Sequence, residues 1–347
     1  MKKVSVIGHF GFGHEYIDGQ TVKTKILTDE LCHYYGEESV LKIDTHGGLK
    51  TLVKAPFQVF SALKKSQNVI MLPAHNGVRV FGRILPMFKR FFKGRKIHYS
   101  VIGGWLPKLV ETKKGLAKAL KKFDGIYVET STMKNDLEQQ GFKNVYVVPN
   151  FKNLTPLSSD ELVYSQSEPY KLCTFSRVTK QKGIEDAVDA VKAVNEALGR
   201  VVYQLDIYGP IDNGQNEWFD ELQKRFSDYV KYGGSVPFDK SVEVLKNYFA
   251  LLFPTRFYTE GIPGTIIDAY AAGVPVISAR WQSFSDIVEE GQTGIGYSLG
   301  EKGELVDILS RLVDEPERIL NMKNNCLKKS ADFLPSKVIE DFVKHLI

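Results

Sequence analysis

Two carboxylates and a helix start lie close together in residues 257–268, whose sequence is FYTEGIPGTIID. Glu260 stands at the start of a turn, and Asp268 follows eight positions later. The turn predicts that the backbone N–H groups of residues 264–266 lack partners at a helix N-terminus, where anions bind. An anion site beside two carboxylates suits a ligand that carries both phosphate and hydroxyl groups, such as a nucleotide sugar.

Two cations follow another predicted strand. Arg177 and Lys182 come after residues 170–175, and Gly183 precedes an apolar helix. Cations at the carboxyl end of a strand suit a diphosphate, because Arg can bind two phosphate oxygens at once and Lys acts as a point charge. The alternative is a solvated basic loop, and for Glu260 it is a surface carboxylate that caps a helix. The two loops together favour a ligand site.

Strands and helices alternate along the whole chain and must position these loops. In the first half, the predicted strands are residues 3–7, 40–44, 68–73, 96–102, 125–129 and 145–148. In the second half, they are residues 170–175, 202–208, 230–232, 250–253 and 274–277. This alternation predicts parallel sheets with right-handed connections. We therefore expect an α/β fold of two doubly wound, Rossmann-like domains that face each other across a ligand-binding cleft.

Length and composition agree with two globular domains. A chain of 347 residues with 43% hydrophobic and 25% charged residues exceeds one ordinary core. A polar stretch at 149–169 is predicted to separate a first domain (1–152) from a second (168–334), and residues 335–347 form an amphipathic helix. No apolar run is long enough to span a membrane. Three widely separated cysteines predict neither a metal site nor disulfides, and favour a reducing cytoplasm.

The charge is divided unevenly between the two halves. Residues 1–150 hold 24 Lys and Arg against 12 Asp and Glu, whereas the remainder holds 22 against 29. The first half is therefore expected to face an anionic partner, either a membrane surface or a nucleic acid. Residues 83–96 and 113–122 are basic helices with an apolar side, which we expect to pack on the sheet and also to contact an anionic membrane. No nucleic-acid-binding motif accompanies the charge, so we expect no nucleic acid.

Three residues at predicted strand ends suggest a second binding surface in the first half. His75 follows the strand at 68–73, and Gly104 and Trp105 follow the strand at 96–102. Glycine permits close approach of a ligand, and an indole ring offers an apolar platform to a sugar. His75 has no partner pattern typical of a metal site or a nucleophile triad.

A glycine-rich loop at residues 8–13 invites comparison with a dinucleotide-binding fingerprint, with Asp44 as the ribose-binding acid. The pattern departs from that fingerprint, because Glu15 and Tyr16 follow Gly13 where Gly or Ala is required. A nicotinamide-dependent oxidoreductase is therefore an alternative with weaker support.

Taken together, these motifs resemble those of the retaining glycosyltransferases of family four, which have the two-domain GT-B fold. The resemblance rests on the second domain and on the order of its motifs, which are Arg177, Lys182-Gly183, Tyr208-Gly209-Pro210, Gly234-Ser235-Val236 and Glu260-Gly261-Ile262-Pro263-Gly264. In the first domain, Gly19-Gln20-Thr21 resembles the family's loop near the donor phosphate and the acceptor.

The resemblance implies a hexosyltransferase that uses a nucleotide sugar, more often UDP than GDP, without a metal or other cofactor and with retention of anomeric configuration. Arg177 and Lys182 would stabilise the departing diphosphate, and Glu260 would hold the donor sugar. The donor-binding residues that it implies are Gly19, Gln20, Gly209, Val236, Gly261, Ile262, Pro263, Gly264, Thr265 and Asp268. The helix at 335–347 would cross back to the first domain.

We expect the first domain to bind the acceptor, a glycan or lipid-linked intermediate of a surface polysaccharide such as capsule, through His75, Gly104 and Trp105. The protein would then work at the cytoplasmic face of the plasma membrane. Two positions depart from the family pattern: Asp268 replaces a glutamate, and Gly103-Gly104 replace a histidine. A non-catalytic GT-B subunit that steers a partner transferase is the alternative, although such a subunit is expected to lose the donor-site charges.

Overall fold

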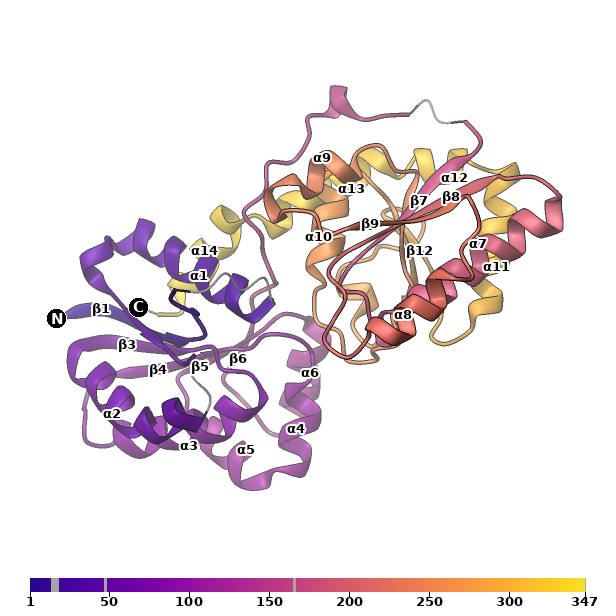
Figure 1. The fold of residues 1–347 in the computed structure, drawn as a ribbon. Coiled ribbons are helices and arrows are strands. Elements are labelled where there is room, and N and C mark those ends of the chain that lie inside the picture. The colour runs from indigo at the N-terminus through magenta and orange to yellow at the C-terminus, as the bar shows by residue number, and fades with distance from the viewer. Residues whose placement is uncertain (14–18, 47–48, 165–166, 347) are drawn as a thin grey trace. The chain divides into compact units, whose positions relative to one another are not determined.

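The computed structural model describes residues 1–13, 19–46, 49–164 and 167–346, with only the backbone for 49–52. Glu15 and Tyr16, which argue against a dinucleotide loop, and Ile347 of the predicted last helix lie outside this part. The chain divides into two compact units, Met1–Asn153 with Phe333–Ile347, and Leu154–Asp332 (Figure 1). Each unit is described by itself.

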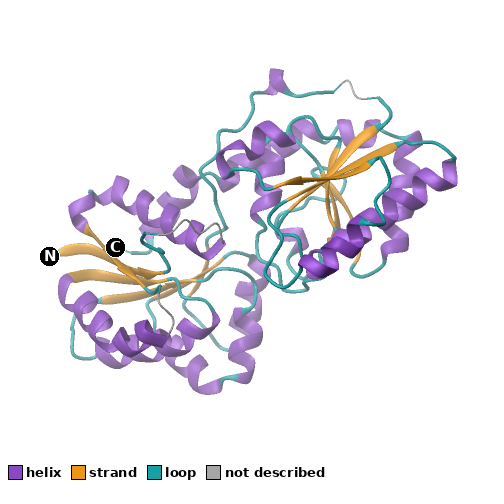
Figure 2. Ribbon diagram, in the orientation of Figure 1, coloured by secondary structure: helices purple, strands orange, loops and turns teal. Residues whose placement is uncertain are grey.

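The first unit is built on a six-stranded parallel sheet (Figure 2). Its strands are β1 (Lys2–Gly8), β2 (Val40–Asp44), β3 (Ser66–Met71), β4 (Lys96–Ser100), β5 (Gly125–Val128) and β6 (Val145–Val147). The strand order is β2-β1-β3-β4-β5-β6. The chain therefore runs from β1 to a neighbour on one side and then back to β3 on the other, and this reversal opens a crevice at the strand ends where ligands bind in such sheets.

Helices cover both faces of this sheet. They are α1 (Gly19–Tyr35), α2 (Leu49–Lys65), α3 (His75–Lys89), α4 (Leu106–Thr112), α5 (Lys114–Leu120), α6 (Ser131–Gln139) and α14 (Pro335–Lys344). One core joins α1 and α14 to one face of the sheet, and a second core joins the remaining helices to the opposite face. The apolar residues of α14, such as Phe342 and Val343, are buried in the first of these cores.

The second unit repeats this architecture with strand order β12-β11-β10-β7-β8-β9. Its strands are β7 (Tyr170–Phe175), β8 (Tyr203–Tyr208), β9 (Val230–Gly234), β10 (Ala250–Phe253), β11 (Val276–Arg280) and β12 (Gly294–Ser298). Its helices are α7 (Ile184–Leu198), α8 (Asn216–Gln223), α9 (Ser241–Leu245), α10 (Gly264–Ala271), α11 (Lys302–Asp314), α12 (Glu317–Leu320) and α13 (Lys323–Ser330). Here the order reverses between β7 and β10, which makes their carboxyl-end loops neighbours.

The predicted α/β fold class is confirmed, and eleven of the twelve strands in the described part of the chain were predicted to within a few residues. The strand that the sequence did not reveal is β12, whose sequence GIGYS contains two glycines and lacks a clear alternation. No helix among the described residues is long and apolar enough to cross a membrane.

Candidate active site

The centre of the second unit's site is an ion pair between the two sequence motifs. Lys182 Nζ lies 2.5 Å from Glu260 Oε1, and Thr255 Oγ1 donates a hydrogen bond of 2.9 Å to the same oxygen. The Lys182 and Glu260 side chains are only 14% and 15% exposed. The ammonium also lies over the rings of Phe253 and Phe257, at 5.2 and 5.4 Å from their centroids. The cation is therefore held in place before any ligand binds.

The loops after β7 and β10 are tied together by backbone contacts. Gly183 has a φ of 69°, and a Cβ at this position would collide with the carbonyl oxygen of Pro254. The backbone N–H of Arg256 donates to Gln181 O at 2.8 Å. The Arg256 guanidinium binds both carboxylate oxygens of Asp186, at the start of α7, at 2.7 and 2.9 Å. These ties keep Lys182 beside Glu260.

Thr255, Arg256 and Asp186 were not recognised in the sequence as part of this site. Thr255 and Arg256 directly precede the stretch 257–268, and Asp186 follows Gly183 by three positions, but residues of these types are common on protein surfaces. Their role follows only from the pairing of the two loops.

Arg177 lies on the same loop as Lys182 but is exposed to solvent. Its Nη1 forms a 2.9 Å ion pair with Asp212, and both side chains are largely exposed. Gly209, at the end of β8, has a φ of 132°, and a Cβ there would collide with the carbonyl oxygen of Ser176. The predicted donor residue Gly209 is thus required for the close packing of this loop. Val236 follows β9 and is half-buried.

The start of α10 lies at the same carboxyl edge of the sheet, directly after the loop that follows β10. Gly261, Ile262 and Pro263 are buried, and Gly264 begins the helix with Pro263 as its N-cap. The prediction that the backbone N–H of Ile266 is unpaired is wrong, because it donates to Pro263 O at 3.0 Å as the first turn closes. The Thr265 hydroxyl is buried and has no hydrogen-bond partner.

Asp268 lies within α10 and is 2% exposed. Its Oδ1 accepts a 2.9 Å hydrogen bond from the hydroxyl of Ser241, the first residue of α9. The side chain therefore links two helices in this state. Its expected contact with a ribose stays a prediction.

The first unit holds the remaining predicted residues. Gly19 and Gln20 begin α1, and Gly104 is buried in the loop after β4. The ring of His75, at the start of α3, stacks on Trp105 with centroids 4.0 Å apart. The Trp105 Nε1–H donates to Ile102 O at 2.7 Å, which fixes the indole. Partial burial and the nearby Arg79 lower the pKa of His75 below its usual value, so the imidazole is neutral near pH 7.

Two polar clusters in the first unit were not predicted. Lys23 of α1 forms a buried ion pair of 2.7 Å with Glu129 and also donates to Val101 O at 3.1 Å. His9, at the end of β1, lies 2.6 Å from Thr21 Oγ1 and 3.1 Å from His46 Nδ1. Glu129 ends a predicted strand, and this position could have marked it as a candidate site residue. Both clusters belong to the carboxyl edge of the sheet.

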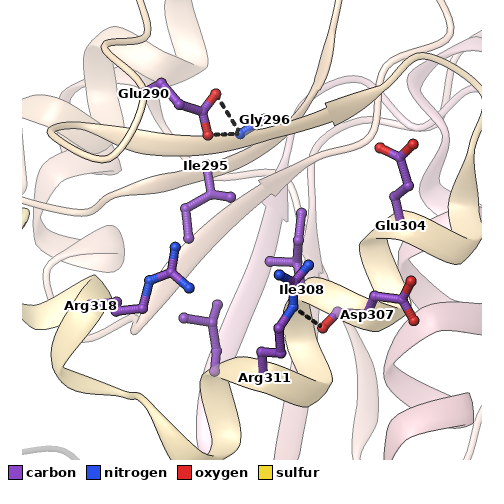
Figure 3. Close-up of a pocket in the computed structure, with 9 residues that line it drawn as sticks. Glu290, Ile295, Gly296, Glu304, Asp307, Ile308, Arg311 and Arg318 are labelled. Atoms are coloured by element: carbon purple, nitrogen blue, oxygen red, sulfur yellow. Dashed lines mark hydrogen bonds between the residues drawn. The ribbon is translucent and has the colours of Figure 1, made fainter.

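A separate hollow of about 270 Å³ lies between β12 and the helices α11 and α12 (Figure 3). It contains none of the predicted site residues. Two of its charged side chains already have partners: Glu290 accepts from the Gly296 N–H, and Arg311 Nε donates to the backbone oxygen of Asp307 at 3.2 Å. We therefore assign the chemistry to the β7–β10 edge rather than to this hollow.

Comparison with known proteins finds a family match within the second unit. Residues 169–315 match the family described as Glycosyl transferases group 1. Over 149 residues the chain is 25% identical to the amylovoran biosynthesis glycosyltransferase AmsK of Erwinia amylovora, covering 42% of this chain and 36% of that protein. The chain spans about a third of the length of the curated relatives it matches.

Solved structures show that the whole fold is GT-B. Sucrose-phosphate synthase from Thermosynechococcus elongatus superposes with a TM-score of 0.79 at 16% identity, covering 99% of this chain and 98% of that one. HepE from Anabaena, in complex with UDP and glucose, gives a TM-score of 0.76 at 15% identity, covering 100% and 99%. The predicted fold and the resemblance to glycosyltransferases of surface polysaccharides are therefore confirmed.

Proposed function

We propose that this protein is a retaining hexosyltransferase. It transfers a hexose or N-acetylhexosamine from a UDP-sugar to a glycan or lipid-linked acceptor in the synthesis of a surface polysaccharide. The match to the group 1 glycosyl transferases and the polysaccharide-related relative support the class, and the UDP-bound HepE structure supports the donor.

The Lys182–Glu260 pair carries this proposal. A diphosphate at the β7–β10 edge brings negative charge to Lys182, and the sugar attached to it brings hydroxyl groups to Glu260. Because the pair is largely buried, a ligand phosphate gains more from Lys182 than it would at an exposed lysine. The site therefore suits a molecule in which phosphate and hydroxyl groups are adjacent, as they are at the anomeric carbon of a nucleotide sugar.

The charge that develops during transfer lies on the departing diphosphate. We propose that Lys182, Arg177 and the start of α10 stabilise it, which is the largest electrostatic demand of the reaction. This assignment requires no metal ion, and the chain has no Asp-x-Asp sequence. In the front-face mechanism implied by the family resemblance, the leaving phosphate oxygen takes the acceptor proton, and the new bond keeps the anomeric configuration.

The acceptor is assigned to the first unit. The His75–Trp105 stack and Gly104 lie at the carboxyl edge of its sheet, where a sugar ring can pack against aromatic groups. The sequence predicts basic helices at 83–96 and 113–122, but in the structure α3 ends at Lys89, and Lys96 begins β4. These two basic segments would bring the protein to the cytoplasmic face of an anionic plasma membrane, where a lipid-linked acceptor resides.

Calorimetric titration with UDP, GDP and their common sugars tests the proposal. We expect UDP to bind, and Arg177→Ala to weaken binding by about tenfold, since one charge-assisted contact is lost. Arg318→Ala is the matched control, because Arg318 is also an exposed arginine paired with a carboxylate but lies on α12. Failure of every nucleotide and nucleotide sugar to bind would favour the non-catalytic subunit and overturn the proposal.

A further inference from the structure

One stretch of the first unit carries charge of a single sign. Residues 45–110 contain 12 Lys and Arg and no Asp or Glu. Helices α2 and α3 both lie in this stretch and pack against each other on the sheet face opposite α1 and α14. Their outer surface is therefore strongly cationic, without acidic residues of its own to neutralise it.

The same surface exposes large apolar side chains. On α2, Val53, Phe57 and Phe60 recur at helical spacing on one side, and Val53 and Phe57 are 77% and 79% exposed. On α3 and the turn that follows it, Met87 and Phe91 are also exposed. Single exposed apolar residues are normal, but five on two adjacent helices and the turn that follows α3 indicate an interaction site.

Packing joins these residues into one surface. The Phe60 ring meets the rings of Phe88 and Phe92 edge to face, with centroids 6.5 and 5.3 Å apart. The guanidinium of Arg90 lies 4.7 Å from the centroid of the Phe91 ring. We call this surface the α2–α3 face and define it by the apolar residues Val53, Phe57, Phe60, Met87 and Phe91, with the exposed cations Lys54, Arg83, Arg90 and Lys93.

We propose that the α2–α3 face docks on an anionic lipid bilayer, with α2 as the element that enters it. The apolar side chains lie at the boundary between headgroups and acyl chains, and the cations bind lipid phosphates. This proposal rests on the proposed function, since a lipid-linked acceptor lies at such a surface. It changes the sequence-based expectation, because α2 was not predicted to take part.

The contrast with α5 supports this assignment. This helix also carries cations, Lys114 and Lys118, but its apolar residues Leu116 and Leu120, like Phe123 beyond it, are buried in the core. It can therefore add attraction to an anionic surface but cannot enter it. A nucleic acid would use the cations of both helices equally and would leave Val53 and Met87 without a partner.

The three native cysteines are all buried, which permits an experiment with site-specific labels. Phe57→Cys, labelled with an environment-sensitive fluorophore, is mixed with phosphatidylglycerol vesicles. Leu198→Cys is the control, because Leu198 is also an exposed apolar residue, at the end of α7 in the second unit. We expect a blue shift of emission at position 57 and none at 198. Equal spectra at the two positions would overturn the proposal.

A co-sedimentation assay with the same vesicles then separates insertion from charge. We expect the double variant V53S/F57S to reduce partitioning by about tenfold, since exposed apolar side chains drive insertion. Phosphatidylcholine vesicles should bind weakly. Unchanged partitioning of V53S/F57S, or a stronger shift of the position 57 label with duplex DNA than with vesicles, would contradict docking on a bilayer.

Failure of the docking proposal is distinguishable from failure of the proposed function. UDP binding depends on Arg177 and Lys182 in the second unit, and the variants at positions 53 and 57 leave those residues unchanged. If UDP binds and vesicles do not, only the docking surface is wrong. If vesicles bind and no nucleotide does, the donor site is wrong.

Discussion

The two sheets of this protein end in edges of very different chemistry. The β7–β10 edge of the second unit has a lysine and a glutamate paired at 2.5 Å, on loops tied by Gly183 and Arg256. The corresponding edge of the first unit has stacked aromatic and imidazole rings and a buried Lys23–Glu129 pair. One fold thus supports two edges, one with a largely buried ion pair that we propose for phosphate and one with stacked rings that we propose for a sugar.

The distribution of histidine follows the same division. All seven histidines lie in the first unit, and none lies in the second. Since histidine is the side chain that titrates between pH 5 and 8, acid sensitivity should belong mainly to the first unit. The comparison therefore predicts that substitutions in the second unit's ion pair affect activity most, and that acid affects mainly the stability of the first unit.

The largest expected effect is on the second unit's charge pair. Lys182→Met should reduce the rate of UDP release from the best-binding UDP-sugar by about a thousandfold, or about 4 kcal/mol, because the leaving diphosphate loses its partly buried cation. Lys180→Met is the control, since Lys180 is an exposed lysine on the same turn. A comparable loss of rate in the two variants would show that the rate depends on the loop as a whole rather than on the Lys182–Glu260 ion pair.

A smaller effect concerns the tie between the two loops of that edge. Gly183→Ala should lower the free energy of unfolding by about 3 kcal/mol or more, because strain at positive φ adds to a collision with Pro254. Gly199→Ala, at the other end of α7, has a similar φ of 63° and open space around it, and should cost only about 1 kcal/mol. Denaturant unfolding followed by the fluorescence of Trp218 and Trp281 measures both, and equal costs would remove the packing argument.

Acid should destabilise the first unit through His98. Burial lowers the pKa of this imidazole from 6.5 to about 4, and the ring is held between Tyr127 and Asn68 at 3.0 and 3.2 Å. Between pH 6.5 and about 4, the unfolded chain binds a proton that the folded chain does not. The free energy of unfolding therefore decreases by about 3 kcal/mol as the pH is lowered through this range.

Urea unfolding at a series of pH values measures this effect. His98→Gln should flatten the dependence over that window, whereas His33→Gln, at an exposed position on α1, should leave it unchanged. A slope that survives in His98→Gln would assign the acid sensitivity to another histidine.

The smallest expected effect lies at the first unit's aromatic edge. His75→Ala should raise the KM for the acceptor by about tenfold through loss of the stacked imidazole and leave UDP binding unchanged. Steady-state rates at saturating donor measure the change. A matching loss of UDP affinity would show that the two edges do not divide donor and acceptor as proposed.

Local patterns were sufficient to predict most of the strands and the residues of the main motifs. Lys182 and Glu260 were predicted because each follows a buried strand and stands beside a glycine, and strand ends are where ligands bind in parallel sheets. By contrast, the contributions of Thr255, Arg256 and Asp186 could not be read from the sequence. Charged and hydroxyl residues are common in loops, and only their partners distinguish them.

The α2–α3 face is a second feature that could not be predicted from the sequence. The helical spacing of the apolar side chains in 83–96 can be read from the sequence. This spacing does not tell which of those side chains are buried and which are exposed. Phe57 is exposed because its side of α2 faces away from the sheet, whereas Leu85 on α3 is fully buried. Orientation on the sheet decides which apolar residues are left for a partner.

The sequence by itself determined that the chain has two parallel α/β domains, that residues 257–268 form a strand-to-helix turn with carboxylates, and that the first half is basic. These are properties of spacing and composition, which need no knowledge of distant contacts. Tertiary structure alone decided that Lys182 pairs with Glu260, which lies 78 residues further along the chain, since the strand order places β7 beside β10. It also decided that Asp268 bonds to Ser241 and that α2 presents its phenylalanines outward, because side-chain partners are set by packing between elements.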